Sequence, residues 1–240
     1  MSSDPLAPLR ALNGVSAALS GARAAIDAIY RRRPRIPSAV AAELSLRAAV
    51  ASAALQGSRY ELTEVRTGTV TDPVLQGALR CAEAVPGLVD RWLRAPRQVL
   101  ARLHVLAARG TVDDSLLGRP VPTAVARLDV LVDEVLAGAQ PGLLRAAVVH
   151  GELLALRAFP GPYGVVARAA ARLELLGSGF DPRGLAVVEA GHLAREPEYV
   201  GCANSFATGT PDGVRAWLRH CATAVELGAA EAAAALDLAG

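Results

Sequence analysis

The chain has 240 residues, which suffices for one domain or for a domain with an appendage. Hydrophobic residues make up 52% of it and aromatic residues only 4%, so we expect a sizeable core built mainly from Ala, Leu and Val. This composition excludes a disordered chain, and a net charge of only +2 argues against nucleic acid as a partner.

The three cysteines, Cys81, Cys202 and Cys221, are scattered and form no CxxC pair. The sequence therefore predicts neither a disulfide framework nor a metal site, and the default location is a reducing cytoplasm. The N-terminus lacks a secretion signal, and no apolar run reaches the roughly 18 residues of a membrane helix without a break. We expect no contact with a membrane.

The predicted elements are helices, because Ala and Leu favour helix and β-branched residues are mostly isolated. The first, Leu9–Arg33, is amphipathic and ends before two prolines. We assign residues 1–37 to an N-terminal helical extension, which either packs on the domain or contacts a partner. The basic stretch Arg31–Arg35 is interpreted as a solvated helix end rather than a phosphate site.

The periodicity predicts further helices, in chain order, over 38–58, 72–85, 96 onward, 123–137, 141–156, 165–176, 185–195 and 212–227. The one long break is "GTVDDSLLGRPVP", Gly110–Pro122, where we expect a short β-hairpin flap. Residues 38–230 are assigned to the domain and 231–240 to an Ala-rich C-terminal tail. The predicted fold class is all-α with this small flap.

Polar residues in apolar surroundings are few. His104 and His150 are interpreted as hydrogen-bonded core residues, because a lone histidine is more often structural than catalytic. His192 and His220 have no partner at a spacing that indicates a metal. The sequence also contains no GxSxG, HExxH or GxxxxGK[ST] motif.

A series of landmarks appears in a fixed order along the chain: Leu103-His104, Gly118-Arg119, Ala146-Ala147 with His150, the loop "RAFPGPYGVVAR", Tyr199 and Trp217. In this order the chain resembles the Fic (Fic/Doc) family over roughly residues 38–230. The resemblance implies a Fic-like helical domain. It also implies an activity in which AMP, or another phosphate-containing group, is transferred to a protein hydroxyl.

The family signature HxFx(D/E)GNGRxxR is degenerate in this chain, beginning with its two charged catalytic positions. Arg157 stands where the family has its histidine base, and an arginine cannot accept the proton. Gly161 stands where the family has the acidic residue that holds Mg²⁺, and it offers no carboxylate. The resemblance therefore implies a site without its base and without its metal ligand.

The phosphate-binding part of the signature is also altered. In the family a Gly-Asn-Gly turn and the following helix N-terminus bind phosphate through backbone N–H groups. Here Pro162 removes one N–H group, Tyr163 adds bulk, and Val165 replaces the first arginine. The matching positions are Phe159, which we expect in the core, Gly164, which eases the turn, and the last arginine, Arg168.

A second family motif, the inhibitory (S/T)xxxE(G/N), resembles "SAALQG" in the predicted helix 38–58. Ser52 and Gly57 match it, and Gln56 stands in place of the glutamate. In the family this glutamate pairs with the last arginine of the signature. We therefore predict that Gln56 lies within hydrogen-bond reach of Arg168.

Two functional hypotheses remain open. The first is a catalytically impaired Fic-like protein that serves as a protein-interaction or regulatory module, with a protein partner bound at the flap 110–122, because the family flap pairs with a target strand. It needs no cofactor, and we expect no binding of ATP with Mg²⁺. The oligomeric state stays open.

The alternative is a transferase of the AMPylation type, or a related enzyme with altered site residues. In this hypothesis Arg157, Arg168 and Arg119 together bind an anionic ligand, and Glu152, Tyr163 or His150 accepts the proton. We favour the first hypothesis, because the loop offers no evident base or metal ligand.

Overall fold

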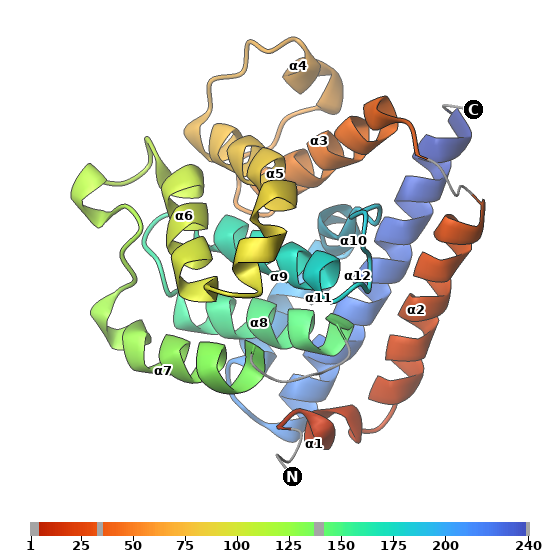
Figure 1. Cartoon of the computed structure of the whole chain (residues 1–240), viewed down its shortest axis with the longest axis vertical. Coiled ribbons are helices and arrows are strands. Elements are labelled where there is room, and N and C mark those ends of the chain that lie inside the picture. The colour runs from red at the N-terminus through yellow and green to blue at the C-terminus, as the bar shows by residue number, and fades with distance from the viewer. Residues whose placement is uncertain (1–4, 33–35, 137–141, 239–240) are drawn as a thin grey trace.

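The computed structural model describes residues 5–32, 36–136 and 142–238, and every regular element within them is helical (Figure 1). The all-α fold class is thus confirmed. The α-helices are α1 (Ala7–Arg10), α2 (Val15–Arg32), α3 (Ser38–Ala54), α4 (Leu62–Arg66), α5 (Pro73–Trp92), α6 (Pro96–Ala108), α7 (Val125–Val130), α8 (Gly142–Leu156), α9 (Tyr163–Gly177), α10 (Val188–Ala194), α11 (Glu196–Phe206) and α12 (Pro211–Leu238). Two 3₁₀ turns, η1 (Asp114–Leu116) and η2 (Pro122–Ala124), and a π-helical turn, η3 (Leu131–Leu136), complete the series.

Local sequence explains where several helices begin, and tertiary packing explains why one helix is longer than predicted. Asp72 caps α5 by accepting a hydrogen bond from the Leu75 N–H at 2.8 Å, and Pro73 occupies the first turn. The helix predicted to end at residue 85 continues through Pro86 to Trp92. Because Trp92 is buried and its indole N–H bonds to Glu174, tertiary packing outweighs the backbone hydrogen bond that Pro86 cannot donate.

Helices α8 and α9 lie side by side in the centre of the molecule (Figure 1). Helices α5 and α6 pack on α9, while α11 and α12 pack on α8, and one apolar cluster runs through all of them. A buried ion pair joins the two central helices, because Arg145 Nε donates to Glu174 Oε1 at 2.6 Å. These two helices carry the two ends of the degenerate signature loop, so their packing fixes its position.

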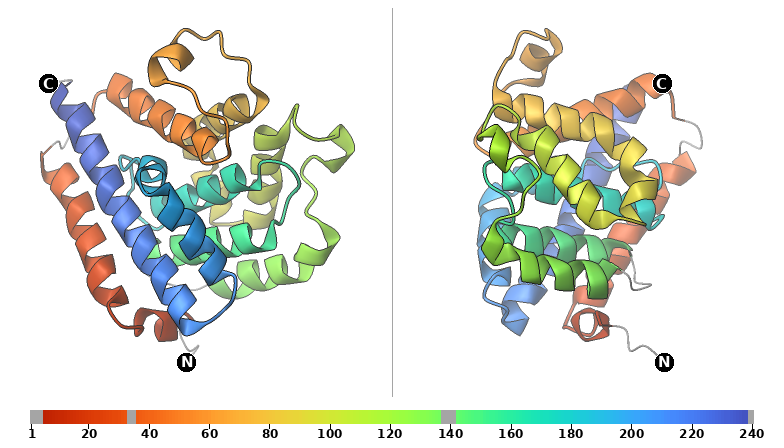
Figure 2. Two further views of the ribbon diagram at one scale, coloured as in Figure 1. Left: turned by 180° about the vertical axis from the view of Figure 1, so that it is seen from behind. Right: turned by 60° about the vertical axis from the view of Figure 1, so that its left-hand side comes forward.

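The N-terminal helix α2 packs along the long helix α12 (Figure 2). Ile26, Ile29, Val225 and Ala232 belong to a second apolar cluster formed there. The single helix predicted over 9–33 is interrupted between Arg10 and Val15. Its last predicted residue, Arg33, lies outside the described residues. So do Ala137 and Pro141, at the ends of two other predicted helices. Residues 231–238, predicted as a tail, continue α12.

The segment 110–122 does not form the predicted β-hairpin. Its regular structure consists of an isolated bridge between Arg109 and Val112, the turn η1, and the first residue of η2. The Asp113 carboxylate accepts from the Ser115 N–H at 2.8 Å and starts this turn, while Pro120 and Pro122 lack N–H donors for a ladder. The segment contacts the signature loop instead, because the Val121 N–H donates to the Ala158 carbonyl at 2.9 Å.

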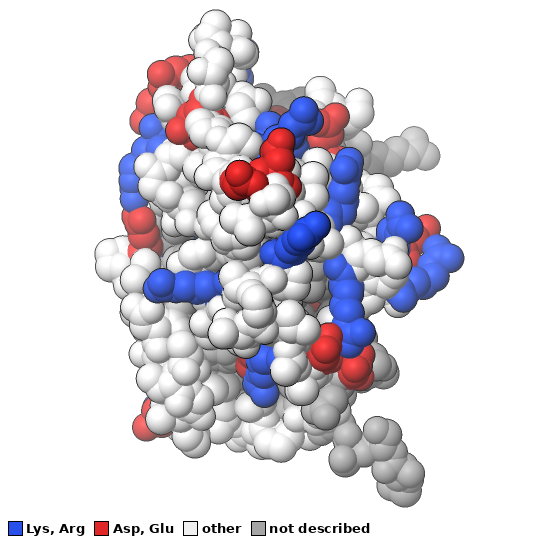
Figure 3. Space-filling model, turned by 90° about the vertical axis from the view of Figure 1, so that its left-hand side faces the viewer, with Lys and Arg blue, Asp and Glu red and all other residues white. Residues whose placement is uncertain are grey.

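Charged side chains are interspersed on the face that carries α6 and the segment 110–122. Figure 3 shows basic and acidic atoms scattered there among a largely uncharged surface. In the part of the chain that the structure describes, no helix combines the length and the apolar character needed to cross a bilayer.

Candidate functional site

The signature loop leaves α8 through an unusual backbone conformation at Arg157. Its φ is +45°, in the left-handed region that glycine usually occupies after a helix. The side chain is exposed, and its guanidinium lies over the Tyr163 ring, 5.7 Å from the centroid. Arg157, which the sequence resemblance aligns with the catalytic histidine of the family, therefore carries backbone strain.

We predict that Arg157→Gly raises the free energy of unfolding by about 1 kcal/mol, because glycine adopts positive φ without a steric cost. Urea unfolding of the purified protein measures the change. Arg157→Ala is the matched control, since it removes the same guanidinium and keeps the strain. Equal stabilities of the two variants would show that the conformation at residue 157 costs nothing.

The loop is anchored to α6 by His104, which contacts Phe159 and Pro160 of the loop. The His104 Nδ1 atom accepts from the Gly118 N–H at 2.9 Å, so Nε2 carries the proton and donates to the Pro160 carbonyl at 3.0 Å. The imidazole also stacks on Phe159, with the ring centroids 4.9 Å apart. Burial lowers the pKa of His104, so the ring stays neutral and connects the segment 110–122 to the loop.

Gly161, which the sequence resemblance aligns with the family's metal ligand, is crowded by two side chains of the segment 110–122. Its φ is +73°, and a β-carbon there would lie 2.7 Å from Val112 Cγ1 and 3.2 Å from Thr111 Oγ1. Two N–H groups at the start of α9 are also bonded within the loop. Tyr163 donates to the Gly161 carbonyl at 2.8 Å, and Val165 donates to the Pro162 carbonyl at 3.0 Å.

Arg168 is buried under the loop and is bonded to the end of α3. Its Nε donates to Ser52 Oγ at 2.9 Å, and one Nη donates to the Ser52 carbonyl at 2.7 Å. The other Nη donates to the Tyr199 hydroxyl at 3.1 Å. Ser52 lies in the last turn of α3, where the helix dipole is negative and carbonyls lack helical partners, so this end of the helix stabilises the cation.

Gln56 was predicted to lie within hydrogen-bond reach of Arg168, and the two side chains meet at Gly164, although the guanidinium donates to Ser52 and Tyr199. Helix α3 ends at Ala54, and the chain beyond it turns so that Gln56 Oε1 lies over Gly164. A β-carbon at Gly164 would collide with that oxygen and would lie 3.1 Å from Arg168 Nη1. Gln56 thus covers the N-terminal end of α9, beside Arg168 rather than bonded to it.

A half-open groove of about 250 Å³ lies above these residues, and Arg157, Arg168, Tyr163 and Gln56 all line it. Two of the three arginines predicted to bind an anion therefore face one cavity. Arg119 does not line it and is exposed on the segment 110–122. The groove also includes Tyr199, Val200, Ala203 and Asn204 of α11, a helix that the sequence did not predict.

The three predicted proton acceptors occupy different environments. Only Tyr163 lines the groove. Glu152 lies in another groove and is bonded to Arg127 at 2.7 Å. His150 is buried behind Arg168 and shares a hydrogen bond of 3.0 Å with the Tyr199 hydroxyl. Burial first, and then the Arg168 charge, hold the pKa of His150 well below its ordinary value, so this ring is neutral.

Solved structures identify the class of this fold. The chain is similar to a Fic family protein from Desulfovibrio desulfuricans G20, with a TM-score of 0.66 and 21% identity over 90% of this chain and 74% of that one. It is also similar to Fic-1 from C. elegans, with a TM-score of 0.72 and 17% identity over 94% of this chain and 75% of that one. No protein-family model and no curated protein match the sequence. The chain has a Fic-like fold, as the order of its landmarks predicted.

Proposed function

We propose that this protein is a Fic-fold pseudoenzyme that does not transfer nucleotide groups and serves as a regulatory or interaction module for a protein partner. The proposal is supported by the geometry of the loop, where side chains of the segment 110–122 crowd Gly161 and N–H groups at the start of α9 are bonded within the loop.

The metal position supports this proposal. A carboxylate at residue 161 is the ligand that Mg²⁺ would need in the family arrangement. Here Val112 and Thr111 fill the space that a side chain at Gly161 would take. Glu152, on the preceding helix, is directed into another groove by its bonds to Arg127. The residues present do not fit a complex of Mg²⁺ and nucleotide.

The phosphate position supports it in the same way. Backbone N–H groups at a helix start bind phosphate only when they are free to donate. The N–H groups of Tyr163 and Val165 donate to loop carbonyls, and the Gln56 amide covers Gly164. Arg168, which matches the last arginine of the family signature, has donors directed to Ser52 and Tyr199. A phosphate group would have to displace several of these contacts at once.

The segment 110–122 is the surface that we propose for the partner. Leu116 is 44% exposed at η1, and the segment rests on the signature loop through His104 and Val121. Because the segment contains no strand, docking would use its exposed apolar side chains rather than strand pairing.

A second candidate function is the binding of a small anionic ligand without metal. It is favoured by one observation, namely that Arg157 and Arg168 line the same half-open groove. This candidate needs no nucleotide transfer and no carboxylate at residue 161.

Calorimetric titration with ATP, with and without Mg²⁺, separates these possibilities. We predict no heat of binding at millimolar ATP in either condition. Micromolar binding that requires Mg²⁺ would contradict the pseudoenzyme. Binding without Mg²⁺ that disappears in Arg168→Ala but persists in Arg119→Ala would support the anion-binding candidate, because Arg119 is basic and lies outside the groove.

A further inference from the structure

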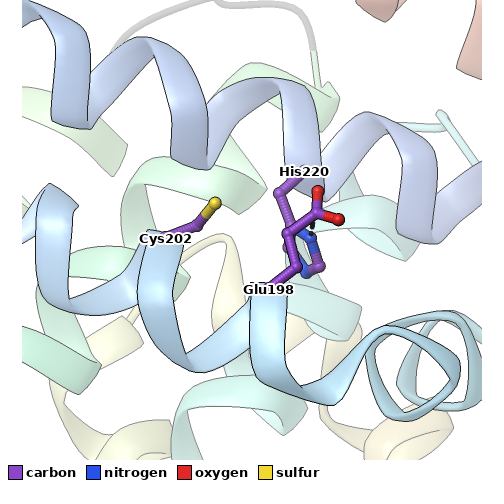
Figure 4. Close-up of side chains that lie close together, drawn as sticks. All are labelled: Glu198, Cys202 and His220. Atoms are coloured by element: carbon purple, nitrogen blue, oxygen red, sulfur yellow. Dashed lines mark hydrogen bonds and ion pairs between the residues drawn. The ribbon is translucent and has the colours of Figure 1, made fainter.

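A cluster of side chains on the opposite side of α11 from the groove has not been assigned a role. Glu198 and Cys202 lie on α11, and His220 lies across from them on α12 (Figure 4). Their potential ligand atoms all lie within 4.8 Å of one another. We propose that Glu198, Cys202 and His220 form a binding site for Zn²⁺.

The backbone brings these three groups together by simple helix geometry. Glu198 and Cys202 are four residues apart, so they lie on the same face of α11 one turn from each other. Helix α12 packs against this face and supplies His220, whose Nδ1 lies 3.4 Å from Glu198 Oε1. Ligands of a tetrahedral zinc ion, at about 2.0–2.3 Å from the metal, are about 3.3–3.8 Å apart. Small side-chain rotations therefore suffice to close the site.

Neighbouring side chains already hold the ligands in a suitable orientation. His220 Nε2 shares a hydrogen bond of 3.0 Å with Nδ1 of the buried His192, which leaves Nδ1 of His220 facing the cluster. The Arg195 Nε donates to Glu198 Oε2 at 2.7 Å, which leaves Oε1 on the side of His220. Zinc ligands are commonly supported by such second hydrogen bonds, because they fix the ligand geometry.

The ligand types select the metal. A thiolate, an imidazole and a carboxylate form a set that suits zinc, whereas Mg²⁺ and Ca²⁺ prefer oxygen ligands alone. Three protein ligands leave one tetrahedral position for water. Solvent can supply this water, because Cys202 is half-buried and the Glu198 side chain is 38% exposed. The Arg195 cation beside Glu198 opposes the metal charge and limits the affinity.

Such a site would have a consequence for the groove. The hydroxyl of Tyr199, adjacent to Glu198, accepts a hydrogen bond from Arg168 and shares another with His150. Zinc would fix α11 against α12 and so would hold Tyr199 at the back of the groove. The site does not depend on the proposed function, since none of its three ligands belongs to the signature loop or to the segment 110–122.

We predict that the full chain, after treatment with a chelator, binds Co²⁺ with a thiolate-to-cobalt charge-transfer band in the near ultraviolet. Zn²⁺ should displace the cobalt and remove the band. Cys202→Ser should abolish the band, and Glu198→Gln should weaken binding by about tenfold or more, because each loses a ligand. Glu198 is partly exposed, so its variant is expected to fold, and circular dichroism checks both variants.

Matched controls come from the same chain. Cys81→Ser removes a buried cysteine on α5. Glu196→Gln removes a carboxylate from α11, the helix that carries Glu198 and Cys202. Both should bind Co²⁺ as the unmodified protein does. The absence of a thiolate band in the unmodified protein, or a band that survives in Cys202→Ser and is lost in Cys221→Ser, would overturn the assignment.

Discussion

Arg145→Met is expected to lower the free energy of unfolding by about 3–5 kcal/mol, because it leaves the Glu174 carboxylate buried without its cation. Both side chains are shielded from solvent, and the pair joins α8 to α9. Glu174 would keep only the Trp92 indole N–H, at 3.0 Å, among the partners described above. Guanidinium chloride unfolding followed by circular dichroism measures the loss.

Two further variants show whether the orphaned charge is the cause. Arg127→Met breaks an ion pair with Glu152 whose arginine side chain is 55% exposed, so it should cost less than about 1 kcal/mol. Adding Glu174→Gln to Arg145→Met removes the buried charge and should recover part of the stability. If the double variant is no more stable than Arg145→Met, the loss comes from packing rather than from charge.

Gly161→Asp restores the family's metal ligand in the sequence, and it should destabilise the protein by about 2–4 kcal/mol. Aspartate at φ +73° costs free energy, and its β-carbon would overlap Val112. We also expect no binding of ATP with Mg²⁺, because the N–H groups of Tyr163 and Val165 stay bonded to loop carbonyls and Gln56 still covers Gly164. Thermal unfolding and calorimetry test the two statements separately.

The control for this prediction is the double variant Gly161→Asp with Val112→Ala. Removing the Val112 methyl groups relieves the overlap but not the backbone strain, so the double variant should be more stable than Gly161→Asp alone. A gain of Mg²⁺-dependent nucleotide binding in either variant would mean that the missing carboxylate alone had silenced the site.

Sequence patterns predicted the helices well where prolines and caps mark their ends, as at Pro73 and Pro96. They failed where long-range contacts decide. Pro86 predicts a helix end, but α5 continues because Trp92 is buried beside α9. The segment 110–122 has the place of a flap, but its prolines and the Asp113 turn prevent pairing.

The candidate site shows the same division. The sequence predicted that Arg157, Arg168 and Arg119 bind one anion; Arg157 and Arg168 line one groove, and Arg119 does not. The motif could not indicate that Arg168 bonds the Ser52 carbonyl, because a backbone acceptor carries no sequence signal. Sequence patterns also missed the cluster around His220, because its partners Glu198 and Cys202 lie on a helix that was not predicted. Glu198 is 22 residues away from His220 in the sequence, so no local spacing indicates the pair.

The pairing of α2 with α12 affects how the chain acquires its structure during translation. Domains assemble as their residues leave the ribosome, N-terminal parts first. The apolar face of α2, with Ile26 and Ile29, is synthesised before α12, the helix whose surface buries it. A nascent chain therefore exposes this amphipathic helix until α12 has been made. Contacts so distant in sequence slow folding, so the apolar face of α2 stays exposed to solvent in the meantime.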